Sequence, residues 1–143
     1  MDTPITNEQD FKKVVTALET KGSGAHFQSA KFDELAKFVH EVLERQDSDQ
    51  ALTLITRGAL SLGSSDVHYD LSEANTQVRF RIDGNLVTIF TLAHREYKLL
   101  LERLKYKSEL KLNITNIPQD GKYRIMDADG RVDVRVSTLP VKT

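Results

Sequence analysis

The sequence predicts an α+β fold, in which an antiparallel sheet carries one packed helix and follows a helical N-terminal extension. Apolar residues in the first third of the chain recur at helical spacing, and after Gly63 they alternate with the period of a strand. Asp83-Gly84, between two alternating segments, supplies the residues of a tight hairpin turn. At 143 residues the chain has the length of one domain.

Three helices are predicted before the sheet. Their apolar stripes place them at about residues 7–20, 30–46 and 50–62, with a glycine-containing break at 21–29. Ser48 or Asp49 is expected to cap the third helix, and Gly63 to end it. We divide the chain into a helical extension or docking segment, 1–48, and a folded domain, 49–143.

The rest of the chain is predicted to be mainly strand. A strand at 66–71 precedes a hairpin over 77–92, and a helix follows at 93–106. Residues 108–118 read as a short extended stretch. A second hairpin over 117–140 closes the chain, with alternation clearest at 132–136.

Composition excludes several classes of protein. The formal net charge is −1, which argues against nucleic-acid binding, although residues 1–50 hold six Lys/Arg against ten Asp/Glu and the remainder holds 14 against 11. The chain has no cysteine, so disulfides and thiolate metal sites are excluded. No apolar run approaches the roughly 20 residues that span a bilayer, so we expect no direct membrane insertion. The polar, acidic N-terminus does not resemble a signal peptide, and we expect a cytoplasmic protein.

The sequence lacks the motifs of a self-contained catalytic centre. There is no phosphate loop, no G-x-G-x-x-G and no nucleophile elbow. Four histidines, at 26, 40, 68 and 94, have no metal-ligand spacing. We therefore expect no catalytic residue, no metal site and no cofactor in this chain.

Two groups in the first hairpin region are candidates for an interface. Arg79 and Arg81 share one face of a strand, although a solvated sheet face with arginine stems over apolar neighbours has the same pattern. Asp66 and His68 are two residues apart, which suits an acid–base dyad but equally a local polar tie or an interface contact.

The second hairpin carries the densest group of cations. Lys122 and Arg124 share one strand face, and Arg131, Asp133 and Arg135 share one face of the partner strand. Such a group suits phosphate binding, since guanidinium groups bind phosphate oxygens in pairs. An ordinary cross-strand ion pair between Asp133 and an arginine accounts for the same spacing.

Residues 51–140 resemble a known family in four linked segments. These are "ALTLITRGALSLGSSDVHYDL", "VRFRIDGNLVTIFTL", "IPQDGKYRI" and "GRVDVRVSTLP". They are similar to the N-terminal domain that precedes the motor in the type II secretion and type IV pilus assembly ATPases. The family pattern runs [AG]-S-D-[IV]-H, R-x-R-x-D-G, L-P-Q-D-G-R and V-D-x-R-[VI]-S-T-L-P.

The resemblance implies a PAS-like domain of a bacterial hexameric ATPase. Its partners would be a RecA-like motor domain, neighbouring subunits and proteins of the secretion or pilus membrane platform, and it would lie in the cytoplasm, peripheral to the inner membrane. ATP and Mg²⁺ are expected only with the motor. The last residues, "STLPVKT", stand where family members continue into the motor, so we expect either a fragment of an ATPase or a motorless relative.

The resemblance also implies which residues contact phosphates. In the family, arginines of this domain reach the nucleotide phosphates when the domain closes on the motor. Those positions fall on Lys122 and Arg135, with Arg124 as a substitute on the same strand face as Lys122. Lys122 departs from the usual arginine and lacks its planar fork. The alternative functions are a free-standing adaptor that docks through its helical extension, or a small-ligand-binding PAS-like module.

Overall fold

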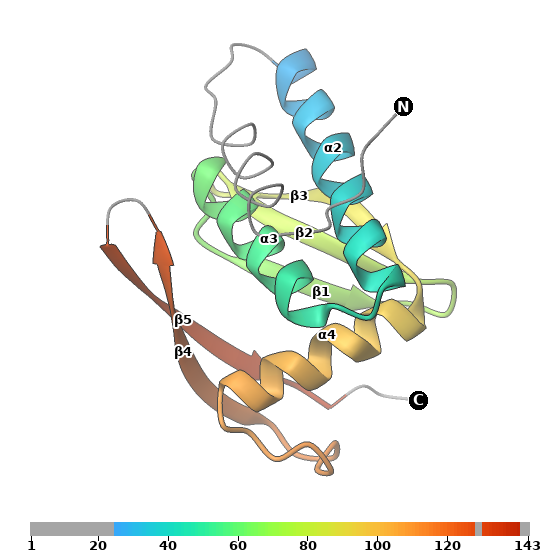
Figure 1. Ribbon diagram of the computed structural model, residues 1–143, viewed down its shortest axis with the longest axis vertical. Coiled ribbons are helices and arrows are strands. Elements are labelled where there is room, and N and C mark those ends of the chain that lie inside the picture. The colour runs from blue at the N-terminus through green and yellow to red at the C-terminus, as the bar shows by residue number, and fades with distance from the viewer. Residues whose placement is uncertain (1–24, 128–129, 141–143) are drawn as a thin grey trace.

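A computed structural model describes residues 25–127 and 130–140, which form three helices and two antiparallel sheets (Figure 1). Two of the helices come before the first sheet in the chain, and the third connects the two sheets. The α+β prediction is confirmed, while the helix predicted at 7–20 lies outside the described residues. The elements are α2 (Ala25–Glu44), α3 (Ser48–Ser61), β1 (Val67–Leu71), β2 (Thr76–Ile82), β3 (Asn85–Leu92), α4 (His94–Lys107), β4 (Gln119–Asp127) and β5 (Gly130–Thr138).

The first three strands form one antiparallel sheet in the order β1-β2-β3. Figure 1 shows α2 and α3 in front of this sheet, with α4 below them in that view. The predicted alternation holds in β2, because Val78 and Phe80 are fully buried while Arg79 and Arg81 are partly exposed.

One apolar core joins helices and sheet. Leu35, Val39 and Val42 of α2 are fully buried in the same cluster as Leu54 of α3 and Phe80 of β2. Burying a side chain of this size stabilises the fold by about 1.5–3 kcal/mol. The predicted boundary at residue 48 therefore falls between two helices, α2 and α3, that share one core.

The turn signals in the sequence mark real turns. Asp83 and Gly84 have positive φ, 51° and 82°, and join the paired residues Ile82 and Asn85, as a two-residue hairpin turn requires. Gly63, with φ of 72°, follows the end of α3 as predicted. The predicted cap, Ser48 or Asp49, was wrong, because Asp47 is the N-cap and accepts the N–H of Gln50 at 3.1 Å.

The extended stretch predicted at 108–118 is also wrong. This segment contains turns and bends and no strand. The N–H groups of its first three residues bond to main-chain carbonyls of α4. Further along, the Gln119 side-chain amide bonds to Lys111 N–H and C=O, at 2.8 and 3.1 Å, and to Ile114 C=O at 3.0 Å. Lys105 Nζ, on a buried side chain, donates to the same Ile114 carbonyl at 3.2 Å.

The closing hairpin, β4–β5, forms a sheet of its own. It extends as a long ribbon beside α3 and α4 in Figure 1. Its inner face reaches the core through Tyr123, Ile125 and Val136, each about nine-tenths buried. We call β4 and β5 together the ribbon.

Candidate functional site

The ribbon separates its apolar and charged side chains onto two faces. On the inner face Tyr123 lies opposite Val134 and Ile125 opposite Val132. The charged residues project from the other face, where the cross-strand pairs are Lys122–Arg135, Arg124–Asp133 and Met126–Arg131, all exposed. The structure therefore brings the predicted phosphate-contacting residues together on one surface.

Lys122 and Arg135 are direct cross-strand neighbours, and we call them the cationic pair. Directly opposed residues in an antiparallel sheet have Cβ atoms about 4.5–5.5 Å apart, and like charges in this position are destabilising. In the part of the chain that the structure describes, neither side chain takes part in an ion pair. An anion held between the two side chains would remove their repulsion.

Arg124 differs from the cationic pair because it already has a counter-charge. Its Nε lies 3.0 Å from Asp133 Oδ1, and both side chains are more than half exposed. An exposed pair of this kind is worth about 0.2–1 kcal/mol. The alternative interpretation, a cross-strand ion pair, thus describes Arg124 and Asp133.

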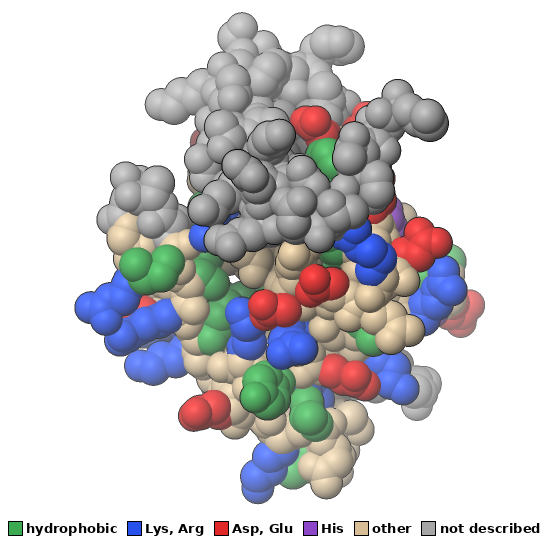
Figure 2. All heavy atoms as spheres, viewed as in Figure 1, with side chains coloured by type: hydrophobic (Ala, Val, Ile, Leu, Met, Phe, Trp, Pro, Cys, Tyr) green, Lys and Arg blue, Asp and Glu red, His purple; other side chains and the backbone are tan. Residues whose placement is uncertain are grey.

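The cations dominate one edge of the molecule. Figure 2 shows Lys and Arg side chains gathered at the left, over the ribbon, whereas acidic and basic groups are mixed elsewhere on this face. Asp120, on the same ribbon face, accepts a hydrogen bond from Ser137 Oγ at 2.6 Å. The cationic pair therefore lies between two cross-strand pairs, Asp120–Ser137 and Arg124–Asp133, each of which contains a carboxylate.

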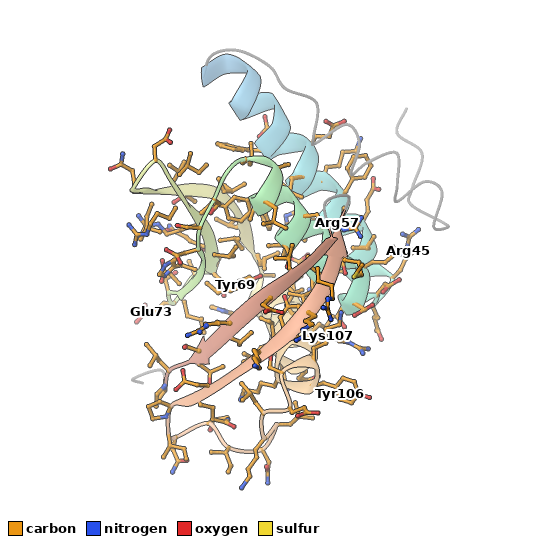
Figure 3. All side chains as sticks on the ribbon, turned by 90° about the vertical axis from the view of Figure 1, so that its left-hand side faces the viewer. Arg45, Arg57, Tyr69, Glu73, Tyr106 and Lys107 are labelled. Carbon is orange, nitrogen blue, oxygen red and sulfur yellow. The ribbon has the colours of Figure 1, made fainter. Side chains whose placement is uncertain are left out.

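Side chains of α3 and α4 hold the ribbon's inner side. Arg57 Nη2 donates to the carbonyl of Met126 at 2.6 Å, and the hydroxyls of Thr56 and Tyr123 lie 3.3 Å apart. Lys107 Nζ lies 5.6 Å from the centre of the Tyr123 ring and forms an ion pair with Asp49 at 3.0 Å. Figure 3 shows Arg57 at the turn end of the ribbon and Lys107 beside its middle. We call Thr56, Arg57, Lys107 and Tyr123 the seam.

Three tyrosines point inward at or near the seam. The rings of Tyr69 and Tyr97 have centroids 5.8 Å apart. Burial raises the pKa of the Tyr69 hydroxyl far above its usual value, and the nearby Tyr123 and Tyr97 raise it further. Burial also raises the pKa of Tyr97 and of Tyr123, the latter opposed by its hydrogen bond with Thr56. All three are therefore neutral packing groups at physiological pH.

The other predicted surface group lies on the three-stranded sheet. Arg81 Nε contacts Asp66 Oδ2 at 3.0 Å, and Arg79 Nη1 contacts Asp70 Oδ2 at 3.5 Å. His68 lies opposite Arg79 in the register. The Asp66 carboxylate bonds to Arg81 and to the Ser65 hydroxyl, so its partners are not those of an Asp–His dyad. A role for Asp66, His68, Arg79 and Arg81 in an interface stays a prediction.

The family model described as "Type II/IV secretion system protein" matches residues 41–143, which are most of the described chain and all of the ribbon. The chain belongs to this family.

Curated relatives carry names of the same kind. The chain is 33% identical over 103 residues to "Type II secretion system ATPase E" of Vibrio cholerae, covering 70% of this chain and 20% of that protein. It is 36% identical over 103 residues to "Type II secretion system protein E" of Klebsiella pneumoniae, covering 70% and 21%. To the protein of the same name from Aeromonas hydrophila it is 33% identical over 136 residues, covering 93% and 27%.

The chain thus spans only about a fifth to a quarter of the length of these relatives. It corresponds to a part of a secretion-ATPase family protein. Among the described residues, none of the helices combines the length and hydropathy needed to cross a bilayer.

Sequence reasoning about this family member missed the seam. Thr56 and Tyr123 are 67 residues apart in the chain, and Arg57 and Met126 are 69 apart. One signal was available, because Tyr123 occupies an inward position of an alternating strand and a buried tyrosine hydroxyl usually finds a partner. The identity of that partner depends on tertiary packing, which periodicity does not encode.

Proposed function

We propose that this chain is a non-catalytic domain of a type II secretion or type IV pilus assembly ATPase. In this proposal the domain couples nucleotide state to the motion of a hexamer, and the cationic pair reaches phosphates held by a RecA-like motor domain. ATP and Mg²⁺ would be bound by that motor. Membership in the secretion-system family supports a role in such a system. The name of the Vibrio cholerae relative supports an association with an ATPase.

The observation that carries the proposal is the cationic pair itself. Lys122 and Arg135 lie opposite each other on an exposed face, while the neighbouring Arg124 is paired with Asp133. Two adjacent cations that take part in no ion pair among the described residues match a phosphoryl group that carries about two negative charges. A charge of this kind at a domain or subunit boundary would act like an arginine finger, by stabilising charge that develops on the transferred phosphoryl group.

The pair contains one guanidinium and one ammonium group. Arg135 presents a planar fork that binds two phosphate oxygens at once, whereas Lys122 acts as a flexible point charge. We therefore assign the orienting contact to Arg135 and a mainly electrostatic contact to Lys122. Arg124 is a weaker candidate because phosphate would have to compete with Asp133.

The test uses the full hexameric ATPase that contains this domain. Arg135→Ala should lower kcat for ATP hydrolysis by roughly 100-fold, the usual cost of removing one donor that stabilises transition-state charge. Lys122→Ala should lower it less, and Lys122→Arg should retain activity. Arg124→Ala, on the same ribbon face, tests the weaker candidate and should lower kcat less than Arg135→Ala does, because Arg124 is already paired with Asp133.

Unchanged ATP hydrolysis in Arg135→Ala would refute the assigned contact. In the adaptor alternative the docking extension is residues 1–48, of which residues 1–24 lie outside the described residues and the apolar stripe of α2 is buried in the core. Docking through α2 would have to use its polar face.

A further inference from the structure

The ribbon's orientation depends on side-chain contacts. Within residues 25–127 and 130–140, β4 and β5 pair only with each other, in a sheet separate from β1-β2-β3. An isolated two-stranded ribbon is marginally stable in water and its position is not fixed by any ladder of main-chain hydrogen bonds to the body. Where the outer face points is therefore decided by what the inner face touches.

Besides the apolar contacts of Tyr123, Ile125 and Val136 with the core, polar side-chain contacts join the inner face to α3 and α4 at two separated places. At the turn end, Arg57 holds the main-chain carbonyl of Met126, at 2.6 Å. Near the middle, Tyr123 contacts Thr56 through its hydroxyl and Lys107 through its ring, at 3.3 and 5.6 Å. Polar contacts at two points along the ribbon restrict its pivoting more tightly than a contact at one point would.

The middle attachment is adjacent to the cationic pair. Tyr123 follows Lys122 in sequence, and its cross-strand partner Val134 precedes Arg135. Successive residues of a strand point to opposite faces, so the direction of the Tyr123 side chain determines the direction of Lys122. Lys107 is itself held by Asp49 of α3 at 3.0 Å, which limits how far this contact can shift.

We infer that Thr56, Arg57 and Lys107 are positioning residues for the cationic pair, and that the ribbon swings as one arm when their contacts break. This inference rests on the proposed function for its purpose, but the motion it describes is a property of the chain alone. The seam sets the direction in which Lys122 and Arg135 point, and it does so through α3, the helix that also packs against α2.

The experiment measures the ribbon's position directly. The chain has no cysteine, so spin labels at Glu44→Cys on α2 and Arg131→Cys on the ribbon report one distance without background. Both positions are exposed. Double electron–electron resonance on the 143-residue chain should give a single narrow distance distribution. Adding Arg57→Met, which has no N–H donor, and Tyr123→Phe should broaden it or add a second maximum.

Two controls separate positioning from stability. Arg124→Gln removes an ion pair from the outer face of the same ribbon and should leave the distribution unchanged. Arg57→Lys keeps a cationic donor and should restore most of the narrow distribution when combined with Tyr123→Phe. Far-UV circular dichroism confirms that each variant is folded; should the double variant be unfolded, Tyr123→Phe alone is measured.

An unchanged distribution in the folded double variant, or in Tyr123→Phe where that is the variant measured, overturns the inference. A lowered unfolding midpoint with an unchanged distance also overturns it, because it shows a stabilising role only. The readout uses no nucleotide. An unchanged spin-label distance therefore does not contradict the proposed phosphate contact. Unchanged ATP hydrolysis in Arg135→Ala, in turn, does not contradict a measured movement of the ribbon.

Discussion

Gly121 offers the sharpest stability test of how the ribbon docks. A Cβ atom at this position would lie 2.5 Å from the carbonyl oxygen of Ser108 and 2.9 Å from Leu110 Cδ2. Favourable contacts between carbon atoms lie at about 3.5–4.0 Å, so the ribbon or the segment after α4 has to move by about 1 Å. The oxygen belongs to the main chain of Ser108, the C-cap of α4, and cannot turn aside as a side chain would.

We expect Gly121→Ala to lower the free energy of unfolding by about 1–3 kcal/mol, the usual cost of adding a carbon to a packed site. Urea unfolding followed by circular dichroism measures this loss. Two-dimensional amide NMR should show shifted signals for the ribbon and for residues near Ser108. Stability within about 0.5 kcal/mol of the parent, with unshifted amides, would refute the argument that the backbone needs glycine here for close approach.

Gly84→Ala is the matched control for this prediction. Gly84 has φ of 82°, and a Cβ atom added there would meet open space, so alanine costs about 1–2 kcal/mol through backbone strain alone. Its amide shifts should stay within the β2–β3 hairpin. A similar loss of stability with different affected residues would separate steric displacement of the ribbon from local strain.

Three further outcomes follow from local contacts. Asp47→Ala removes the cap of α3 and should cost about 0.5–2 kcal/mol in urea unfolding, whereas Asp47→Asn keeps the acceptor; equal losses would contradict the capping explanation. Glu96→Ala removes the bonds to Ala93 N–H, at 2.9 Å, and to His40 Nδ1, at 2.7 Å, so it should destabilise more than Glu96→Gln, which keeps an acceptor. Because burial raises the pKa of the three inward tyrosines, the unfolded chain ionises first, from about pH 10.0, and stability present below that pH should fall as pH rises. In a Tyr106→Phe background, phenolate absorbance and loss of far-UV signal should appear together, and absorbance from an intact fold near pH 10 would contradict this.

Local patterns predicted the elements whose causes are local. The β2–β3 hairpin followed from alternation plus Asp83-Gly84, and α3 followed from its apolar stripe and Gly63. The prediction of an extended stretch at 108–118 was wrong because Leu110, Leu112 and Ile114 alternate like a strand. In the structure the Gln119 side chain bonds to main-chain groups of Lys111 and Ile114 that a strand would pair with a neighbour. Such side-chain bonds compete with secondary structure and leave no periodic signal.

The candidate site also has some features that the sequence predicts and others that depend on tertiary structure. Which residues share the ribbon's outer face could be predicted, because alternation alone fixes it. That Lys122 lies opposite Arg135, and that Arg124 is neutralised by Asp133, depends on the register of the two strands. The inward fit of Tyr123, Ile125 and Val136 against the core favours this register, and that fit cannot be read from one strand.

The structure also constrains how an exposed cationic pair could be selective. Lys122 and Arg135 are exposed, and among the described residues no ion pair fixes their rotamers, so they cannot define a precise phosphate site by themselves. Precision then has to come from the placement of the whole ribbon relative to the partner that holds the phosphate. The seam contacts, which we propose set that placement, lie at two points, one of them beside Lys122. In the proposed contact Lys122 acts as a point charge, which tolerates small changes in direction that a bidentate fork does not.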